Sequence, residues 1–146
     1  MDRVLSMLGL ARKAGRVEIG EEPVGAAARA KKARVILLAQ DAAPSSARRA
    51  ASFAQTGNCP LLTVPAGKDD LGRILSRGAV AMAAITDIGL AEAVVRKLAQ
   101  VDPDRFGPVA EELAPKAQRA IERRQEQARH EKNLRRGRKS RGKPQK

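Results

Sequence analysis

The chain has 146 residues, which suits one domain with an appendage, and its 29 Lys and Arg against 16 Asp and Glu give a net charge of +13. An excess of this size predicts a polyanionic partner, most often nucleic acid, over the alternative of a basic protein with no dedicated partner. The chain has two phenylalanines and no tryptophan or tyrosine, which excludes aromatic base stacking as the main binding mode. It has one cysteine, which excludes a disulfide framework.

Hydrophobic spacing and turn residues predict helices and strands in alternation over the first hundred residues. Helices are predicted at 2–14, 23–30, 44–56, 68–75 and 90–99, and strands at 16–19, 35–38, 61–64 and 79–86. Such alternation predicts an α/β fold with a central sheet covered by helices on both faces. Asp87 is predicted to cap the last of these helices.

The stretch between Ile19 and Pro44 carries the strongest local signals. Gly20, Glu21 and Glu22 precede a proline that suits a first helical turn, and the two carboxylates lie beside the positive end of the predicted helix. A basic cluster then leads into the apolar run Val35–Leu38, which is typical of a strand buried on both faces.

The composition changes after residue 100, so we predict one domain over 1–100 and a basic extension, helical or disordered, over 101–146. The extension holds 14 Lys and Arg against seven Asp and Glu. Pro103, Pro108 and Pro115 predict interruptions, residues 116–135 favour a helix that is polar all round, and 133–146 are typical of disorder. The extension is either an electrostatic arm for RNA phosphates or a solubilising tail, and we favour the arm.

Residues for catalysis are scarce. His130 is the sole histidine and lies in the extension, so a Ser-His-Asp or Cys-His arrangement has little support. No phosphate-binding glycine loop and no converging metal ligands are recognisable, and no cofactor is predicted. There is neither a membrane-spanning apolar run nor a signal peptide, so the expected location is the cytoplasm and no membrane partner is predicted.

Three segments carry a family resemblance: "IGEEPVGAAARAKKARVILLAQDAAP", "CPLLTVPAGKDDLGRIL" and "AMAAITDIGLAEAVV". Together they resemble the ribosomal protein L7Ae/L30e/S12e/Gadd45 family, most closely its bacterial YlxQ-type members, over about residues 3–98. The resemblance implies a three-layer α-β-α sandwich with a four-stranded mixed sheet. It also implies binding of kink-turns, which are sharply bent RNA duplexes with a short bulge and sheared G·A pairs.

The resemblance further implies a binding face in two parts, the helix start at Gly20 and the loop at 76–80, braced by Asp41 and Lys68. At the helix start, Glu22 stands where the family carries Asn or Lys, and Pro23 and Ala26 also replace polar residues. An ionised Glu22 has no hydrogen-bond donor for a guanine edge, although it can accept from one. The residues expected to bind RNA are Gly20, Glu21, Glu22, Arg29, Lys32, Lys68, Arg73, Ser76, Arg77, Gly78, Ala79 and Val80.

Three functions are therefore weighed. The leading hypothesis is a non-catalytic protein that binds structured RNA, with ribosomal RNA as the expected partner. The second is a protein-interaction module of the same fold that has lost RNA recognition and meets a ribosome-associated factor or a second copy. The third and weakest is an enzyme acting on a small phosphorylated substrate held at the Gly20 helix start.

Overall fold

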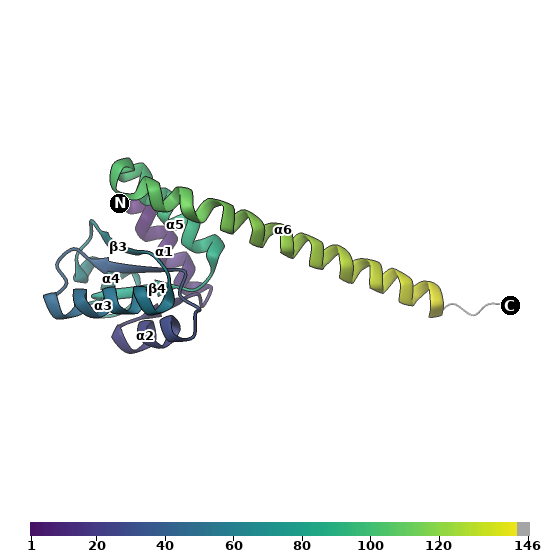
Figure 1. Ribbon diagram of the computed structural model, residues 1–146, viewed down its shortest axis with the longest axis horizontal. Helices are drawn as coiled ribbons and strands as arrows, with labels where there is room; N and C mark the ends of the chain where they lie inside the picture. Colours follow the sequence, from purple (N-terminus) through teal and green to yellow (C-terminus); the bar gives the residue numbers. More distant parts are fainter. Residues whose placement is uncertain (143–146) are drawn as a thin grey trace.

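A four-stranded sheet with the strand order β1-β4-β2-β3 forms the centre of the computed structural model, which describes residues 1–142 (Figure 1). Its strands are β1 (Val17–Ile19), β2 (Val35–Ala39), β3 (Leu61–Val64) and β4 (Met82–Ile85). Strand β2 runs parallel to β3 and antiparallel to β4, which also pairs antiparallel with β1. The sheet is therefore mixed, as predicted, and β4 is shorter than the predicted strand because it begins only at Met82.

Helices cover both faces of the sheet. α2 (Glu21–Arg29) and α3 (Pro44–Gly57) lie on one face, and α1 (Asp2–Lys13), α4 (Lys68–Ile74) and α5 (Ile88–Val101) lie on the other. Every residue of β2 is buried, with Ile36 and Leu38 packed toward α2 and α3 and Val35 and Leu37 toward the opposite layer. The predicted strand with two covered faces and the predicted three-layer sandwich are both confirmed.

The chain continues after α5 into one long helix, α6 (Pro103–Gly142), which projects well beyond the sandwich (Figure 1). The prediction that prolines interrupt this region is wrong. Pro103 begins the helix, where its missing N–H has no intrahelical partner to lose. Pro108 and Pro115 deprive the carbonyls of Asp104 and Glu111 of their helical donors, and both of these residues are exposed to water.

The first part of α6 belongs to the core, which was not predicted from the sequence. Phe106, Leu113 and Ala117 are buried, and Val109 and Ala110 pack beside them against the cluster that contains α5. These positions follow helical spacing and form an apolar stripe. The predicted extension thus contributes buried side chains to the sandwich.

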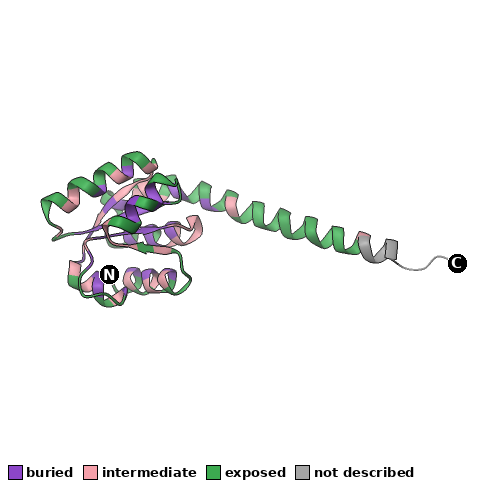
Figure 2. Cartoon of the chain, turned by 90° about the horizontal axis from the view of Figure 1, so that it is seen from below, coloured by how far each residue is buried: buried purple, intermediate pink, exposed green. Residues whose placement is uncertain are grey.

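Between Ala117 and Gly137 almost every residue of α6 is exposed (Figure 2). This confirms the prediction of a helix that is polar all round, and Ile121 and Leu134 are exposed to water. The helix also continues through residues 133–142, for which disorder was predicted. Residues 143–146, the end of the same predicted stretch, lie outside the described residues.

Candidate functional site

The helix start at Gly20 and the loop at 76–80 meet at one cavity of about 430 Å³, here called the Gly20 cavity. It is lined by Ile19, Gly20, Glu21, Pro23, Arg77, Ala79, Val80, Ala81 and Met82. The N–H of Gly20 donates to the carbonyl of Met82 over 3.1 Å, which ties the start of α2 to β4. Gly20 has a φ of +96°, a backbone conformation that residues other than glycine rarely adopt.

Backbone contacts to α4 hold the loop in place. The N–H of Val80 donates to the carbonyl of Lys68 over 3.0 Å, and the N–H of Lys68 donates to Asp41 Oδ1 over 2.8 Å. Asp41 and Lys68 therefore occupy the connecting positions that a bracing role requires. At the other end of the loop, the N–H of Arg77 donates to the carbonyl of Gly72 over 2.7 Å.

Within the loop, exposure divides the side chains. Ser76, Arg77, Gly78 and Ala79 are exposed, whereas Val80 is 3% exposed and packs into the core. Val80 consequently shapes the cavity without offering an apolar surface to a ligand. Of these exposed residues, Arg77 and Ala79 line the Gly20 cavity, whereas Ser76 lines a different hollow together with Leu10 and Ile74.

Ionic contacts change the chemistry at the start of α2. Glu21 accepts a hydrogen bond of 3.1 Å from the Ser46 hydroxyl and pairs with Arg49, while Glu22 is exposed. The Gly20 N–H is not available to a phosphate, because it already donates to the Met82 carbonyl. The N–H groups of Glu21 and Glu22 are donors in the first turn of α2, which the helix itself leaves without partners.

Some expected RNA-binding residues lie outside the Gly20 cavity. Arg29 is in the last turn of α2, at the opposite end of the helix from Gly20. Lys32 lines another hollow, of about 270 Å³, which shares only Pro23 with the Gly20 cavity. Arg73 is exposed and pairs with Asp70 at 2.9 Å. These three residues are not brought together with Gly20 and Ala79.

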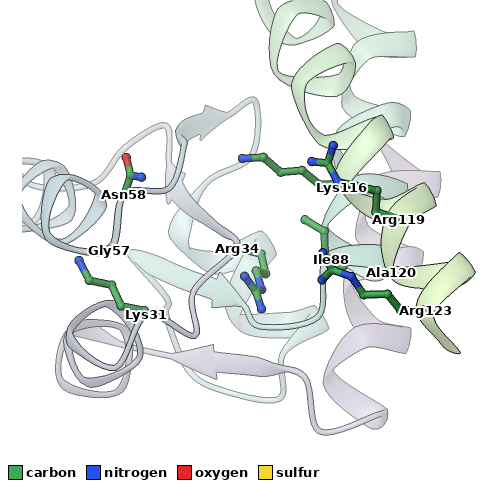
Figure 3. A pocket seen from close by; sticks show the side chains of 9 residues that line it. All are labelled: Lys31, Arg34, Gly57, Asn58, Ile88, Lys116, Arg119, Ala120 and Arg123. Carbon is green, nitrogen blue, oxygen red and sulfur yellow. The ribbon is translucent and has the colours of Figure 1, made fainter. Parts of the chain in front are cut away.

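A further hollow, of about 540 Å³, lies between the sandwich and α6, and we call it the basic groove (Figure 3). Its lining comprises Lys31, Arg34, Gly57, Asn58, Ile88, Lys116, Arg119, Ala120 and Arg123. The groove was not predicted from the sequence, although the i, i+3, i+7 spacing of Lys116, Arg119 and Arg123 places them on one helix face. That spacing does not tell which way the face points.

Groups of three or more His, Cys, Asp or Glu side chains suited to a metal ion are absent from the described part of the chain. Among residues 1–142, no helix is long and apolar enough to cross a membrane.

The chain resembles known proteins over its first two thirds. The model of the ribosomal protein L7Ae/L30e/S12e/Gadd45 family matches residues 2–95. Among solved structures, a protein with unknown function from Bacillus halodurans has a TM-score of 0.58 and 26% identity, covering 67% of this chain and 94% of its own. A 15.5 kD RNA-binding protein from Giardia lamblia has a TM-score of 0.56 and 17% identity, covering 69% and 86%, respectively. No curated protein sequence matches significantly.

Proposed function

The chain belongs to the ribosomal protein L7Ae/L30e/S12e/Gadd45 family, and on that premise we propose that it binds kink-turn-like RNA at the Gly20 cavity, without catalysis. Proteins of this family are generally non-catalytic RNA binders. The supporting observation is the cavity itself, in which the start of α2 and the exposed loop at 76–80 line one surface. A bent RNA presents phosphates and unstacked bases close together, so a protein that binds it needs charged and apolar groups side by side.

The proposed contacts follow from what each group can offer. The Arg77 guanidinium and the N–H groups of Glu21 and Glu22 bind backbone phosphates, aided by the positive end of α2. Ala79 covers an unstacked base through apolar contact. Glu22, exposed in the first turn of α2, accepts hydrogen bonds from the N1 and N2 groups of a guanine.

The projecting part of α6 adds affinity that does not depend on RNA sequence. Its exposed Lys and Arg side chains, including Arg129, Lys132, Arg135 and Arg136, lie along the outer half of the helix. Each phosphate that they neutralise releases condensed counterions. We further propose that the chain is a YlxQ-type member of the family, that its target is ribosomal RNA and that it acts in the cytoplasm.

A second candidate function is a protein-interaction module on the same fold. It is favoured by the exposed Glu22, Pro23 and Ala26, which place no side-chain donor on the start of α2. In this alternative a ribosome-associated protein contacts the helix start and the 76–80 loop.

Variants of the 76–80 loop test the proposal in the full chain. Ala79→Glu puts a negative charge on the surface that would cover a base, and Arg77→Gln removes a phosphate contact. We expect Ala79→Glu to weaken binding of a kink-turn RNA about tenfold or more and Arg77→Gln about threefold to tenfold. Arg3→Gln, at an exposed site on α1, serves as the control and should change affinity little.

Gel shifts or fluorescence anisotropy at fixed salt would measure these affinities, with thermal unfolding confirming that each variant is folded. Equal affinities for the wild type and both loop variants would contradict the proposed site. Binding of a ribosome-associated protein that is lost in Ala79→Glu, with RNA affinity unchanged, would favour the interaction module.

A further inference from the structure

We propose that the basic groove is a second RNA-binding site, which holds the backbone phosphates of a duplex flanking the bend at the Gly20 cavity. This inference rests on the proposed function, because the same RNA supplies the phosphates. The groove is separate from the Gly20 cavity, since the two share no lining residue. It also involves α6, which lies beyond the residues matched by the family model.

The groove brings basic side chains together from distant parts of the chain. Lys116, Arg119 and Arg123 extend from one face of α6 toward the sandwich, and Arg34 faces them from the position just before β2 (Figure 3). Lys31 and Asn58 form the opposite wall. None of the lining residues is acidic.

These positive charges are largely uncompensated within the protein. In the described portion of the chain, no ion pair includes Lys31, Arg34, Arg119 or Arg123. Lys116 lies 3.7 Å from Glu112 one helical turn away, an exposed pair that contributes little. Like charges facing one another across a hollow repel, so an anion between them is favoured.

Contacts from the sandwich fix the position of the α6 wall. Leu113 is part of the hydrophobic core, and Ala117, one turn further along α6, is also buried. On the next turns, Arg124 donates to Asp87 Oδ1 over 2.9 Å, which joins α6 to the start of α5. The three basic residues of α6 lie between or beside these anchors, so the groove exists before any ligand binds.

Lys31 has a backbone conformation that its residue type rarely adopts. It follows the C-cap of α2 with a φ of +59°, in the left-handed region where glycine is the usual residue. A lysine there costs about 1 kcal/mol relative to glycine. Its ammonium group contacts the carbonyl of Thr56 at the end of α3. The lysine thus keeps a charge at the groove despite the local strain.

The chemistry of the groove fits phosphate better than a base or an apolar ligand. It has no aromatic residue to stack on a base, and Ile88 and Ala120 are its apolar side chains. Guanidinium groups bind phosphate oxygens through two parallel hydrogen bonds. A groove lined mainly by Lys and Arg, with no ring to stack on a base, should therefore bind chiefly the RNA backbone.

The test compares the full-length wild type with Arg34→Gln/Arg119→Gln/Arg123→Gln, using a kink-turn RNA flanked by a long duplex. A matched control, Arg3→Gln/Lys13→Gln/Arg48→Gln, loses the same charge from exposed positions outside both sites. We expect the groove variant to bind about tenfold or more weakly than this control. The slope of log K against log salt concentration should also be smaller in magnitude by about two to three for the groove variant. Lys31→Gly should also weaken binding while keeping the melting temperature within a few degrees.

The outcomes separate this inference from the proposed function. If the groove variant matches the control in affinity and salt dependence, while Ala79→Glu weakens binding, the groove proposal is overturned and the Gly20 cavity stands. If the wild type binds no RNA, both proposals fail. If the groove variant binds a long-flanked RNA weakly but a short-flanked RNA as well as the control does, the groove proposal is supported.

Discussion

The backbone N–H of Gly20 donates to the carbonyl of Met82 over 3.1 Å, and this bond joins the start of α2 to the strand that follows the 76–80 loop. The two parts of the candidate site are therefore held by main-chain contacts. Side chains at its surface, such as Arg77 and Ala79, can be changed without removing that support.

Gly72 allows the loop to pack closely on α4. A Cβ at this position would lie 2.6 Å from the carbonyl oxygen of Gly78, a backbone atom that cannot move aside easily. We expect Gly72→Ala to destabilise the fold by about 1–3 kcal/mol and to displace the loop, which weakens RNA binding. Gly78→Ala, where an added Cβ meets nothing within 4 Å, is the control. Urea unfolding of both variants measures the change in stability. Equal stabilities would show that the close approach of Gly72 to the Gly78 carbonyl is unimportant.

The first turns of α6 are expected to be part of the cooperative fold. Phe106 and Leu113 are each 1% exposed, so we expect Phe106→Ala or Leu113→Ala to cost about 2–5 kcal/mol of unfolding free energy. Ile121 lies further along the same helix and is 44% exposed, so Ile121→Ala should cost less than about 0.5 kcal/mol. Thermal or urea unfolding distinguishes them. A similar small effect at all three positions would mean that α6 does not stabilise the sandwich.

Asp87 couples α5 to α6 and should make stability depend on acid pH. Its carboxylate accepts from the Leu90 N–H and from Arg124, both at 2.9 Å. Partial burial tends to raise the pKa of Asp87, but hydrogen bonds from Leu90 and Arg124 and the charges of Arg124 and Arg16 outweigh it and hold this pKa below its usual value. The ionised carboxylate therefore stabilises the fold at pH values above the usual pKa of an aspartate. This contribution is lost as the pH falls through the lowered pKa of Asp87.

We expect Asp87→Ala to lower the unfolding free energy at pH 7 by about 1–2 kcal/mol, and Asp87→Asn by less because asparagine can still cap the helix. The difference between wild type and Asp87→Ala should shrink in strong acid. Denaturant titrations between neutral and acid pH measure it, and a difference independent of pH would rule out this role.

The outer half of α6 is expected to act as an electrostatic arm. A chain that ends after Ala128 loses nine Lys and Arg and one Glu, yet it keeps the residues that line both candidate sites. We expect weaker RNA binding and a flatter dependence of log K on log salt, with the preference for bent RNA retained. Affinities measured across a salt series test this, and an unchanged slope would show that the outer helix is not an RNA-binding arm.

Local patterns predicted most of the sandwich, since a strand such as Val35–Ala39 is recognisable from its own apolar residues. The capping role of Asp87 was likewise predicted from its place before an apolar helix and is confirmed by its bond to Leu90. The path of α6 was not predictable in this way. Proline usually ends a helix, and the stripe from Phe106 to Ala117 has only two large side chains, Phe106 and Leu113, that are fully buried.

The sites show the same division between local and long-range information. The Gly20 helix start and the 76–80 loop were predicted from a family resemblance, which carries long-range information. The burial of Val80 and the bond from the Gly20 N–H to Met82 depend on packing that no short segment reveals. The basic groove requires the direction of α6 as well as its sequence, so Arg34 and Arg123 could not be associated beforehand.

The most direct test of the account compares two RNAs that differ only in the kink-turn, one bent and one a plain duplex of equal length. Binding of the full-length protein is measured by fluorescence anisotropy at about 200 mM salt, where non-specific binding is weakened. We expect a preference of about tenfold or more for the bent RNA, and the loss of that preference in Ala79→Glu. Equal affinity of the wild type for the two RNAs would contradict recognition of bent RNA at the Gly20 cavity.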